Sequence, residues 1–374
     1  MRLFVLTLIS LMYLFITYAI ANKLQRIFQP ERPFWTISFL HLFFLLCSLT
    51  TIAAFLIENV NWGLLGTFGM YWFGLICVSS LIFLIIDSLI WIFGHIGTSN
   101  ISEKGKLLIG IGSIVLIVCC FIYGMVSANR IVHTTYEVKI EKKSTLDSLK
   151  IVMFSDLHLG YVNGQERVDR IIEQINQLQP DIVLIAGDFF DGNLQAISNP
   201  NQLIESFQQL SSTYGNYLIL GNHDAGDTFL QMLSFIQDAG IKILSDEAIL
   251  IDEAFYLIGR KDLSPIGYQG TMPRADLSDL VSSEMTSYPV IVMDHQPSPL
   301  SDYQEVDLIL SGHTHQGQLF PFNLVTKAFY EIDYGHLQAV SGEQIIVSSG
   351  VGTWGPPLRL GTASEIVTIN VTFD

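Results

Sequence analysis

Short polar motifs follow a series of apolar segments in the second half of the chain. Each stands directly after a strand-like run, and they are Asp156-x-His158, Gly187-Asp188-x-x-Asp191, Gly221-Asn222-His223-Asp224, Asp294-His295 and Gly312-His313-x-His315. Carboxylates, a carboxamide and neutral imidazoles without thiolates are suitable ligands for divalent ions such as Mn, Fe or Zn. Five of the nine histidines of the chain stand in these motifs, so we predict a metal site.

The spacing within the motifs suits two metal ions that lie close together. An Asp-x-His or His-x-His pair lets alternate side chains of one loop turn toward neighbouring ions, and a shared carboxylate offsets the repulsion between two dications. Glycines at 187, 221 and 312 allow the backbone to approach the ligands closely. A single histidine is more often a packed or surface residue than a ligand, so the prediction depends on the five motifs together.

Short strands and helices alternate around these motifs. Strand-like apolar runs cover 151–154, 182–186, 217–220, 290–293, 308–310 and 345–347. Apolar residues recur at helical spacing over 168–178 and over 229–236, before a glycine at 240. This alternation predicts an α/β domain with strands buried on both faces. The carboxyl ends of the strands in an open α/β sheet share one rim, where we expect the motifs to meet.

The first half of the chain has the composition of a membrane domain. Only ten charged residues fall in 1–128, and apolar runs at 3–21, 34–57, 68–93 and 107–126 each reach the roughly 20 residues that cross a bilayer. None has the polar face of a soluble helix, so we predict four transmembrane helices. A cleaved signal peptide is the alternative for the first run, since Ala19-Ile-Ala21 resembles a cleavage site.

Basic residues in the short loops predict the orientation in the membrane. The first and third loops carry Lys23, Arg26, Arg32, Lys104 and Lys106. The second loop carries none, so loops one and three are predicted to be cytoplasmic and the second half extracytoplasmic. The opposite orientation is favoured by four basic residues after the last span, Arg130, Lys139, Lys142 and Lys143. Asp87, near the end of the third span, is expected to pack between helices or to reach the interface.

The second half is acidic and free of cysteine. It holds 13 Lys and Arg against 31 Asp and Glu, which disfavours nucleic acid as a docking partner because phosphate backbones are bound by clustered basic residues. The absence of cysteine excludes a disulfide framework there. We therefore expect a membrane domain at 1–128, a stalk and opening hairpin strand at 129–149, and one large domain at 150–374.

The order of the motifs resembles that of the calcineurin-like metallophosphoesterases over residues of about 150–370. Three longer strings resemble the membrane-anchored bacterial branch of YkuE-like phosphoesterases and UDP-diacylglucosamine pyrophosphatases, namely Gly259-Arg-Lys-Asp262, Asp294-His-Gln-Pro297 and Gly352-Thr-Trp-Gly-Pro-Pro-Leu-Arg359. Gln316 departs from the branch, which has glycine there. The resemblance implies a four-layer α/β fold, a β-sandwich flanked by helices, after the four transmembrane helices.

The resemblance also implies two divalent metal ions and a role for each motif residue. Asp156, His158, Asp188 and His315 would hold one ion, and Asp188, Asn222, His295 and His313 the other. His223 would supply a proton to the leaving group, with Asp191 fixing its tautomer. We expect Arg274 and Arg359 to bind substrate phosphate, since a guanidinium forks onto phosphate oxygens, with surface salt bridges as the alternative.

These features together predict a membrane-anchored phosphoesterase. It would hydrolyse a phosphomonoester, phosphodiester or pyrophosphate bond by attack of a metal-bridging hydroxide. Its substrate would be a phosphorylated small molecule or lipid, and the membrane tether favours a lipid-linked one. The alternative from another class is an inactive sensor or scaffold with the same fold, against which the complete ligand set argues.

Overall fold

The computed structural model describes residues 2–31, 33, 36–56, 62–95, 101–266 and 273–374. Arg32, which bears on the predicted orientation, lies outside the described residues. The chain divides into two compact units. One consists of Met1–Val126 with Gly355–Leu358, and the other of Ser127–Trp354 with Arg359–Asp374.

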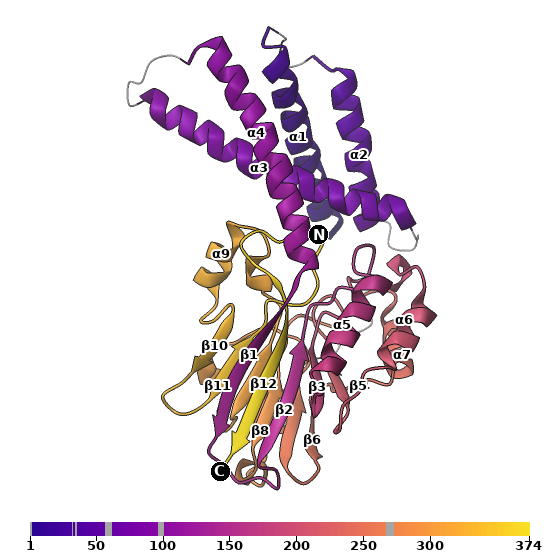
Figure 1. Cartoon of the computed structure of the whole chain (residues 1–374). Coiled ribbons are helices and arrows are strands. Elements are labelled where there is room, and N and C mark those ends of the chain that lie inside the picture. Colours follow the sequence, from indigo (N-terminus) through magenta and orange to yellow (C-terminus); the bar gives the residue numbers. More distant parts are fainter. Residues whose placement is uncertain (1, 32, 34–35, 57–61, 96–100, 267–272) are drawn as a thin grey trace. The chain divides into compact units, whose positions relative to one another are not determined.

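Four long apolar helices make up most of the first unit (Figure 1). They are α1 (Arg2–Phe28), α2 (Phe39–Leu56), α3 (Gly63–His95) and α4 (Glu103–Asn129). Each is long and apolar enough to cross a membrane, which confirms the predicted four helices. Small polar side chains link three of them, because Trp72 Nε1 donates to Ser48 Oγ over 2.9 Å and Ser48 Oγ donates to Thr17 Oγ1 over 3.1 Å.

Twelve strands form two six-stranded sheets in the described part of the second unit (Figure 1). The first sheet has, in spatial order, β1 (Ile131–Ile140), β12 (Ser364–Phe373), β2 (Ser148–Phe154), β3 (Ile182–Ala186), β4 (Asn216–Ile219) and β5 (Lys242–Ile243). The second has β10 (Gly335–Gln338), β11 (Gln344–Val347), β9 (Leu308–Ser311), β8 (Val290–Met293), β7 (Phe255–Gly259) and β6 (Glu247–Ile251). Both are mixed sheets with mainly parallel pairs in their centres.

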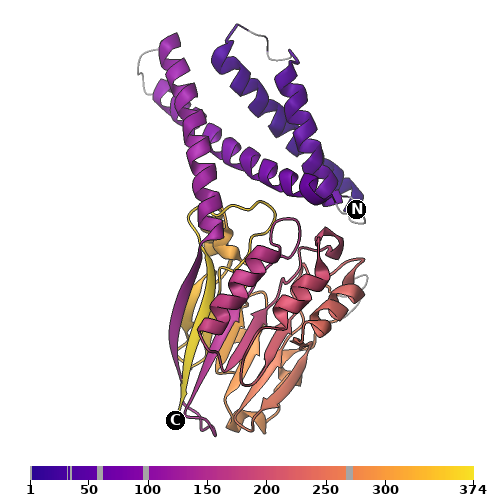
Figure 2. The same ribbon diagram turned by 45° about the vertical axis from the view of Figure 1, so that its right-hand side comes forward.

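The two sheets and the helices are packed in layers. Alternate residues of β2 separate the cores, since Ile151 and Met153 join the core between the sheets while Val152 and Phe154 face the helices. Three helices cover the outer face of the first sheet (Figure 2), namely α5 (Gln165–Gln177), α6 (Pro200–Phe207) and α7 (Phe229–Asp238). Two short helices follow later in the chain, α8 (Leu277–Leu280) and α9 (Phe322–Phe329). This arrangement confirms the predicted sandwich and the strands buried on both faces.

The predicted opening hairpin is wrong. The strand after the stalk, β1, does not pair with β2, because β12 lies between them, parallel to β1 and antiparallel to β2. The final strand of the domain therefore closes the first sheet. Strand β12 is ten residues long and mostly buried, so its pairing outweighs the short connection between β1 and β2.

Candidate metal centre

The polar motifs follow strands of both sheets. Strands β2, β3 and β4 belong to the first sheet and lead to Asp156, Asp188 and Asn222, whereas β8 and β9 belong to the second sheet and lead to His295 and His313. We expected all five loops on the rim of a single open sheet, and this expectation is wrong. The centre forms where the carboxyl ends of parallel strands from the two packed sheets come together.

One cluster joins the first motif to the last. Asp156, His158 and His315 are buried, and one possible ligand atom of each lies within 4.8 Å of those of the other two. His158 Nε2 and His315 Nε2 are 3.0 Å apart, and His315 Nε2 is 3.4 Å from Asp156 Oδ1. Three donor atoms of the types that bind divalent ions therefore face one point.

A second cluster joins the middle motifs and lies next to the first. Asp188, His295 and His313 meet the same 4.8 Å criterion. Asp188 Oδ2 lies 3.1 Å from His295 Nε2 and 3.7 Å from His158 Nε2, so its carboxylate faces both clusters. This is the position that a bridging ligand requires.

The orientation of His295 and a buried oxygen of Asn222 indicate that the centre fits metal ions. His295 Nδ1 is 2.7 Å from the Ala186 carbonyl oxygen, to which it donates, so Nε2 faces the cluster. Within the described residues, Asn222 Oδ1 is buried and has no hydrogen-bond partner. A buried acceptor without a partner costs about 1–3 kcal/mol, and a cation would satisfy this oxygen.

The backbone of the ligand loops adopts an unusual conformation. Five motif residues have positive φ angles, namely Asp156 (54°), His158 (48°), Asp188 (51°), His313 (70°) and His315 (48°). Such angles are uncommon outside glycine and cost of the order of 1–3 kcal/mol each. Residues in these conformations cluster at functional sites, where the surrounding structure holds them.

Two glycines are required by the close approach of the loops. A Cβ atom at Gly221 would lie 2.3 Å from Asp188 Oδ1, and one at Gly312 would lie 2.4 Å from Asp156 Oδ2. Neither carboxylate can move away without leaving its cluster. The expectation that these glycines let the backbone pass beside the ligands is confirmed.

Burial and the neighbouring charges divide the imidazoles into two kinds. Burial lowers the pKa of His313 to about 4 and, with His158 beside it, holds the pKa of His315 well below its usual range. Burial would also lower the pKa of His295, but the Asp188 carboxylate raises it well above its ordinary value. His313 and His315 therefore present lone pairs at neutral pH, whereas His295 must lose a proton to become a ligand.

His223 and Asp191 lie beside the first cluster. The His223 ring is between the rings of His158 and Trp354, with centroid distances of 5.0 and 5.8 Å. Asp191 Oδ1 is 3.5 Å from His158 Nδ1 and 3.9 Å from His223 Nδ1. The carboxylate that we expected to orient His223 is therefore positioned between that residue and His158.

Asp224 connects two of the ligand loops. Its carboxylate is fully buried and accepts hydrogen bonds from the backbone N–H groups of Phe189, Phe190 and Gly221 over 2.7–3.1 Å. Burial, together with the nearby Asp188, raises the pKa of Asp224 to about 7. Asp224 thus holds the loop after β4 against the loop after β3.

The structure does not place the two expected arginines as open phosphate clamps. The Arg359 guanidinium is fully buried and donates to the carbonyl oxygens of Ser349 and Gly352 over 2.6 and 2.8 Å. Arg274 donates to Asp294 Oδ1 over 2.9 Å and to the Lys261 carbonyl oxygen over 2.8 Å. Both guanidinium groups fasten loops of the centre, because the terminal nitrogens of each donate to protein acceptors.

Two residues beside the centre received no role from the sequence. Ser155 donates to Asp156 Oδ2 over 2.5 Å and so orients a ligand. Trp354 is 45 % exposed next to His223, where it offers an aromatic surface at the edge of the centre. Ser155 directly precedes the Asp156-x-His158 motif, and Trp354 stands in the string that ends at Arg359. Their positions in or beside these motifs were the signal that the sequence offered.

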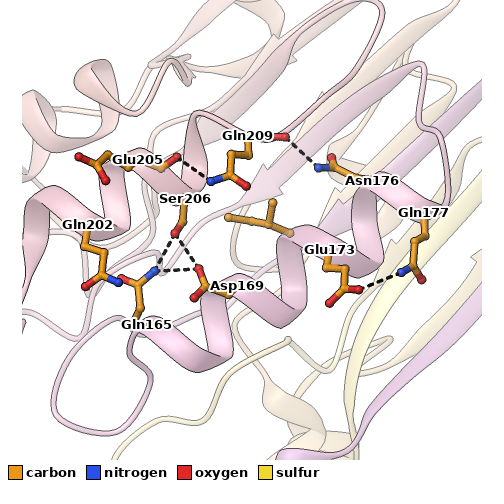
Figure 3. Close-up of a pocket in the computed structure, with 10 residues that line it drawn as sticks. Gln165, Asp169, Glu173, Asn176, Gln177, Gln202, Glu205, Ser206 and Gln209 are labelled. Carbon is orange, nitrogen blue, oxygen red and sulfur yellow. Dashed lines mark hydrogen bonds between the residues drawn. The ribbon is translucent and has the colours of Figure 1, made fainter.

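A groove of about 680 Å³ between α5 and α6 lies apart from the motifs (Figure 3). Its polar side chains bond to one another, as Gln165 Nε2 and Ser206 Oγ both donate to Asp169 Oδ1 over 2.7 and 2.6 Å. None of its lining residues belongs to the motifs. The groove therefore plays no part in the metal centre.

Comparisons with known proteins agree with the resemblance. A family model described as calcineurin-like phosphoesterase matches residues 149–317. An uncharacterised metallophosphoesterase of Aquifex aeolicus is 33 % identical over 238 residues, which cover 63 % of this chain and 90 % of the relative. Bacillus subtilis YkuE, an uncharacterised metallophosphoesterase, is 30 % identical over 242 residues, which cover 60 % of this chain and 79 % of YkuE.

Some relatives are longer than the region of similarity. A bovine transmembrane protein with metallophosphoesterase domain is 30 % identical over 251 residues, which cover 63 % of this chain and 56 % of that protein. The chain likewise spans 60 % of the length of two other curated relatives that it matches.

Proposed function

Because the chain belongs to the calcineurin-like phosphoesterase family, we propose that it is a two-metal hydrolase of phosphoester bonds. The observation that carries the proposal is the Asp188 carboxylate, which lies 3.1 Å from His295 and 3.7 Å from His158 in two adjoining clusters. Two divalent ions, when bound, supply Lewis acidity to phosphoryl oxygens and lower the pKa of an attacking water.

The proposed ligand sets divide along the observed clusters. One ion takes Asp156, His158 and His315, the other takes Asn222, His295 and His313, and Asp188 is shared. Mn, Fe and Zn all suit this mixture of carboxylate, amide and imidazole donors. Three neighbours orient proposed ligands. Ser155 donates to Asp156, the Ala186 carbonyl accepts from His295, and Asp191 lies beside His158. Such contacts fix the positions of the ligand atoms.

His223 is proposed to donate a proton to the leaving group. Its side chain is 28 % exposed, so it can reach a bound substrate while remaining against His158. Burial lowers its pKa even though Asp188 opposes the effect, so the imidazolium that donates the proton is the minor form at neutral pH, although it is the stronger acid. Asp191, 3.9 Å away, is proposed to orient the ring.

The finer proposal is a membrane location and a lipid-linked phosphate or pyrophosphate as substrate. Four helices long enough to span a bilayer support the location, and a membrane enzyme meets such a substrate directly. The exposed indole of Trp354 beside His223 supports an organic leaving group with apolar surface. A soluble phosphomonoester or phosphodiester is the competing substrate class.

A substrate panel tests the proposal. The full chain, purified in detergent and loaded with Mn, would be assayed on soluble phosphomonoesters, phosphodiesters and lipid-linked pyrophosphates. We expect hydrolysis of at least one class, with the lipid-linked class preferred. A flat response from a sample that holds two ions per chain would contradict the enzyme and favour an inactive scaffold.

A further inference from the structure

A charged cavity of about 820 Å³ lies among α1, α3 and α4, within the first unit. Its charged lining residues are Lys23, Arg26, Glu31, Asp87, Glu103 and Lys106. The volume falls in the roughly 300–1,000 Å³ range of small-molecule sites. Isoleucines from all three helices complete the wall, among them Ile27, Ile86 and Ile109, so the cavity has a polar part and an apolar part.

The helices present these residues on regular faces. Ala19, Lys23 and Ile27 of α1 are spaced by four residues, which places them on one stripe, and Lys106, Gly110 and Ser113 form a similar stripe on α4. A Cβ atom at Gly110 would lie 2.7 Å from side-chain carbons of Ile27. The missing side chain therefore lets α4 approach α1 at the edge of the cavity.

Two ion pairs account for four of the six charges. Lys23 pairs with Asp87 across α1 and α3, and Lys106 Nζ lies 2.7 Å from Glu103 Oε1. Arg26 and Glu31 have no ionic partner among the residues that the structure describes. One cation and one carboxylate thus remain available in the same cavity.

The positions along the helices match the boundary of a bilayer. Arg26 is in the last turn of α1 and Glu103 in the first turn of α4, so the charges gather at the ends of apolar spans. Ile109 stands three residues further into α4 than Lys106, while Ile27 and Ile86 adjoin Arg26 and Asp87 in the chain, so apolar side chains line the cavity beside its charges. A ligand with a charged head and hydrocarbon chains would satisfy both the charged and the apolar side chains of the cavity.

We propose that this cavity binds a phospholipid whose headgroup carries a primary ammonium group, with the phosphate on Arg26 and the ammonium on Glu31. The balance of charge is the reason, because the two ion pairs leave one cation and one carboxylate, and an anionic headgroup would leave the Glu31 carboxylate unmatched. A quaternary ammonium cannot donate a hydrogen bond to Glu31. The inference depends on the proposed membrane location and is independent of the phosphoesterase activity.

Lipid binding to the delipidated full chain in detergent tests the proposal by native mass spectrometry. Phosphatidylethanolamine should bind about tenfold more tightly than phosphatidylcholine or phosphatidylglycerol with the same chains, since it gains one hydrogen bond between charged groups. Arg26→Gln should weaken its binding about tenfold, and Glu31→Gln should abolish the preference over phosphatidylcholine. Lys104→Gln, on α4 but outside the lining, is the matched control and should change neither.

Preferential binding of phosphatidylglycerol would overturn the proposal, as would equal binding of all three lipids. Arg26→Lys is a second variant in case Arg26→Gln is not recovered folded, and it should bind with intermediate affinity because it keeps the charge and loses the fork. Hydrolysis of a soluble phosphoester by the same samples separates a failure here from a failure of the proposed enzyme.

Discussion

Asp188 is the residue through which the two clusters are coupled. Asp188→Asn should lower both the bound metal and kcat, the latter by about 10² or more, because a neutral amide cannot offset two adjacent positive ions. Metal analysis of the purified protein and hydrolysis rates measure the two effects. Asp169→Asn, the same change on the surface of α5, is the control. Two ions bound with turnover near that of the parent chain would contradict the shared-ligand assignment.

Substitution of His223 distinguishes a proton donor from a metal ligand. His223→Ala should leave both ions bound and reduce kcat by about 10²–10⁴ for an alkyl phosphate, whose alkoxide needs a proton. The loss should be small for a nitrophenyl ester, whose phenolate leaves unaided. Steady-state kinetics on the two esters, with metal analysis, make the comparison. An equal loss on both esters, or the loss of one ion, would reassign His223.

From the raised pKa of His295 we expect metal binding to release a proton at neutral pH. Its pKa is raised well above the usual value in the metal-free protein, so the imidazole is charged near pH 7 and must become neutral to bind an ion. Affinity should therefore increase with pH over the neutral range. His313, with a pKa of about 4, is already neutral there and adds nothing to the release. Calorimetric titration of Mn in buffers of different ionisation enthalpy measures the released proton, and a heat independent of buffer would contradict the prediction.

At the scale of the elements, the centre depends on how closely the loops after β3 and β4 approach. Gly221→Ala would place a Cβ atom 2.3 Å from Asp188 Oδ1 and 2.5 Å from the Asp188 backbone nitrogen. The Asp188 carboxylate must shift, so metal affinity should fall by about 10–100-fold, as when the support of a ligand is lost. Gly164→Ala is the control, because nothing lies within 4 Å of its Cβ position. Calorimetric Mn affinities compare the two, and equal affinities would show that the loop tolerates the methyl group.

The elements themselves were predicted unevenly from the sequence. The apolar runs at 182–186 and 290–293 became β3 and β8, and the helical spacing over 168–178 became α5, since these patterns are local. Strands β5, β6, β7, β10 and β12 were missed. The partners of β12 are β1 and β2, both more than 200 residues earlier, and nothing in the local sequence specifies so distant a pairing.

At the scale of the whole molecule, the prediction to test is on which side of the membrane the second domain lies. If the first and third loops are cytoplasmic, protease added outside intact cells, after removal of any wall, should digest the chain beyond Arg130. Immunoblotting against the carboxyl end would follow the digestion, with a cytoplasmic protein as the control for intact membranes. Protection in intact cells and digestion after lysis would reverse the orientation and place the substrate in the cytoplasm.

The sequence by itself determined two properties of this protein, the type of chemistry at its site and the division of the chain into a membrane part and a second domain. The donor types in five ordered motifs predicted a metal centre, and four uninterrupted apolar runs predicted four spanning helices, because both signals are carried by residues adjacent in the chain. The order of the motifs along the chain was sufficient for the family resemblance.

Only the tertiary structure decided how those residues meet. It brought strand ends from two sheets together, turned Asp188 toward both clusters, and buried Arg359 under backbone carbonyls instead of leaving it open to phosphate. These outcomes depend on contacts such as that of His313 N–H with Asp156, 157 residues apart. Such contacts follow from the packing of two sheets around a common core, and local periodicity cannot specify them.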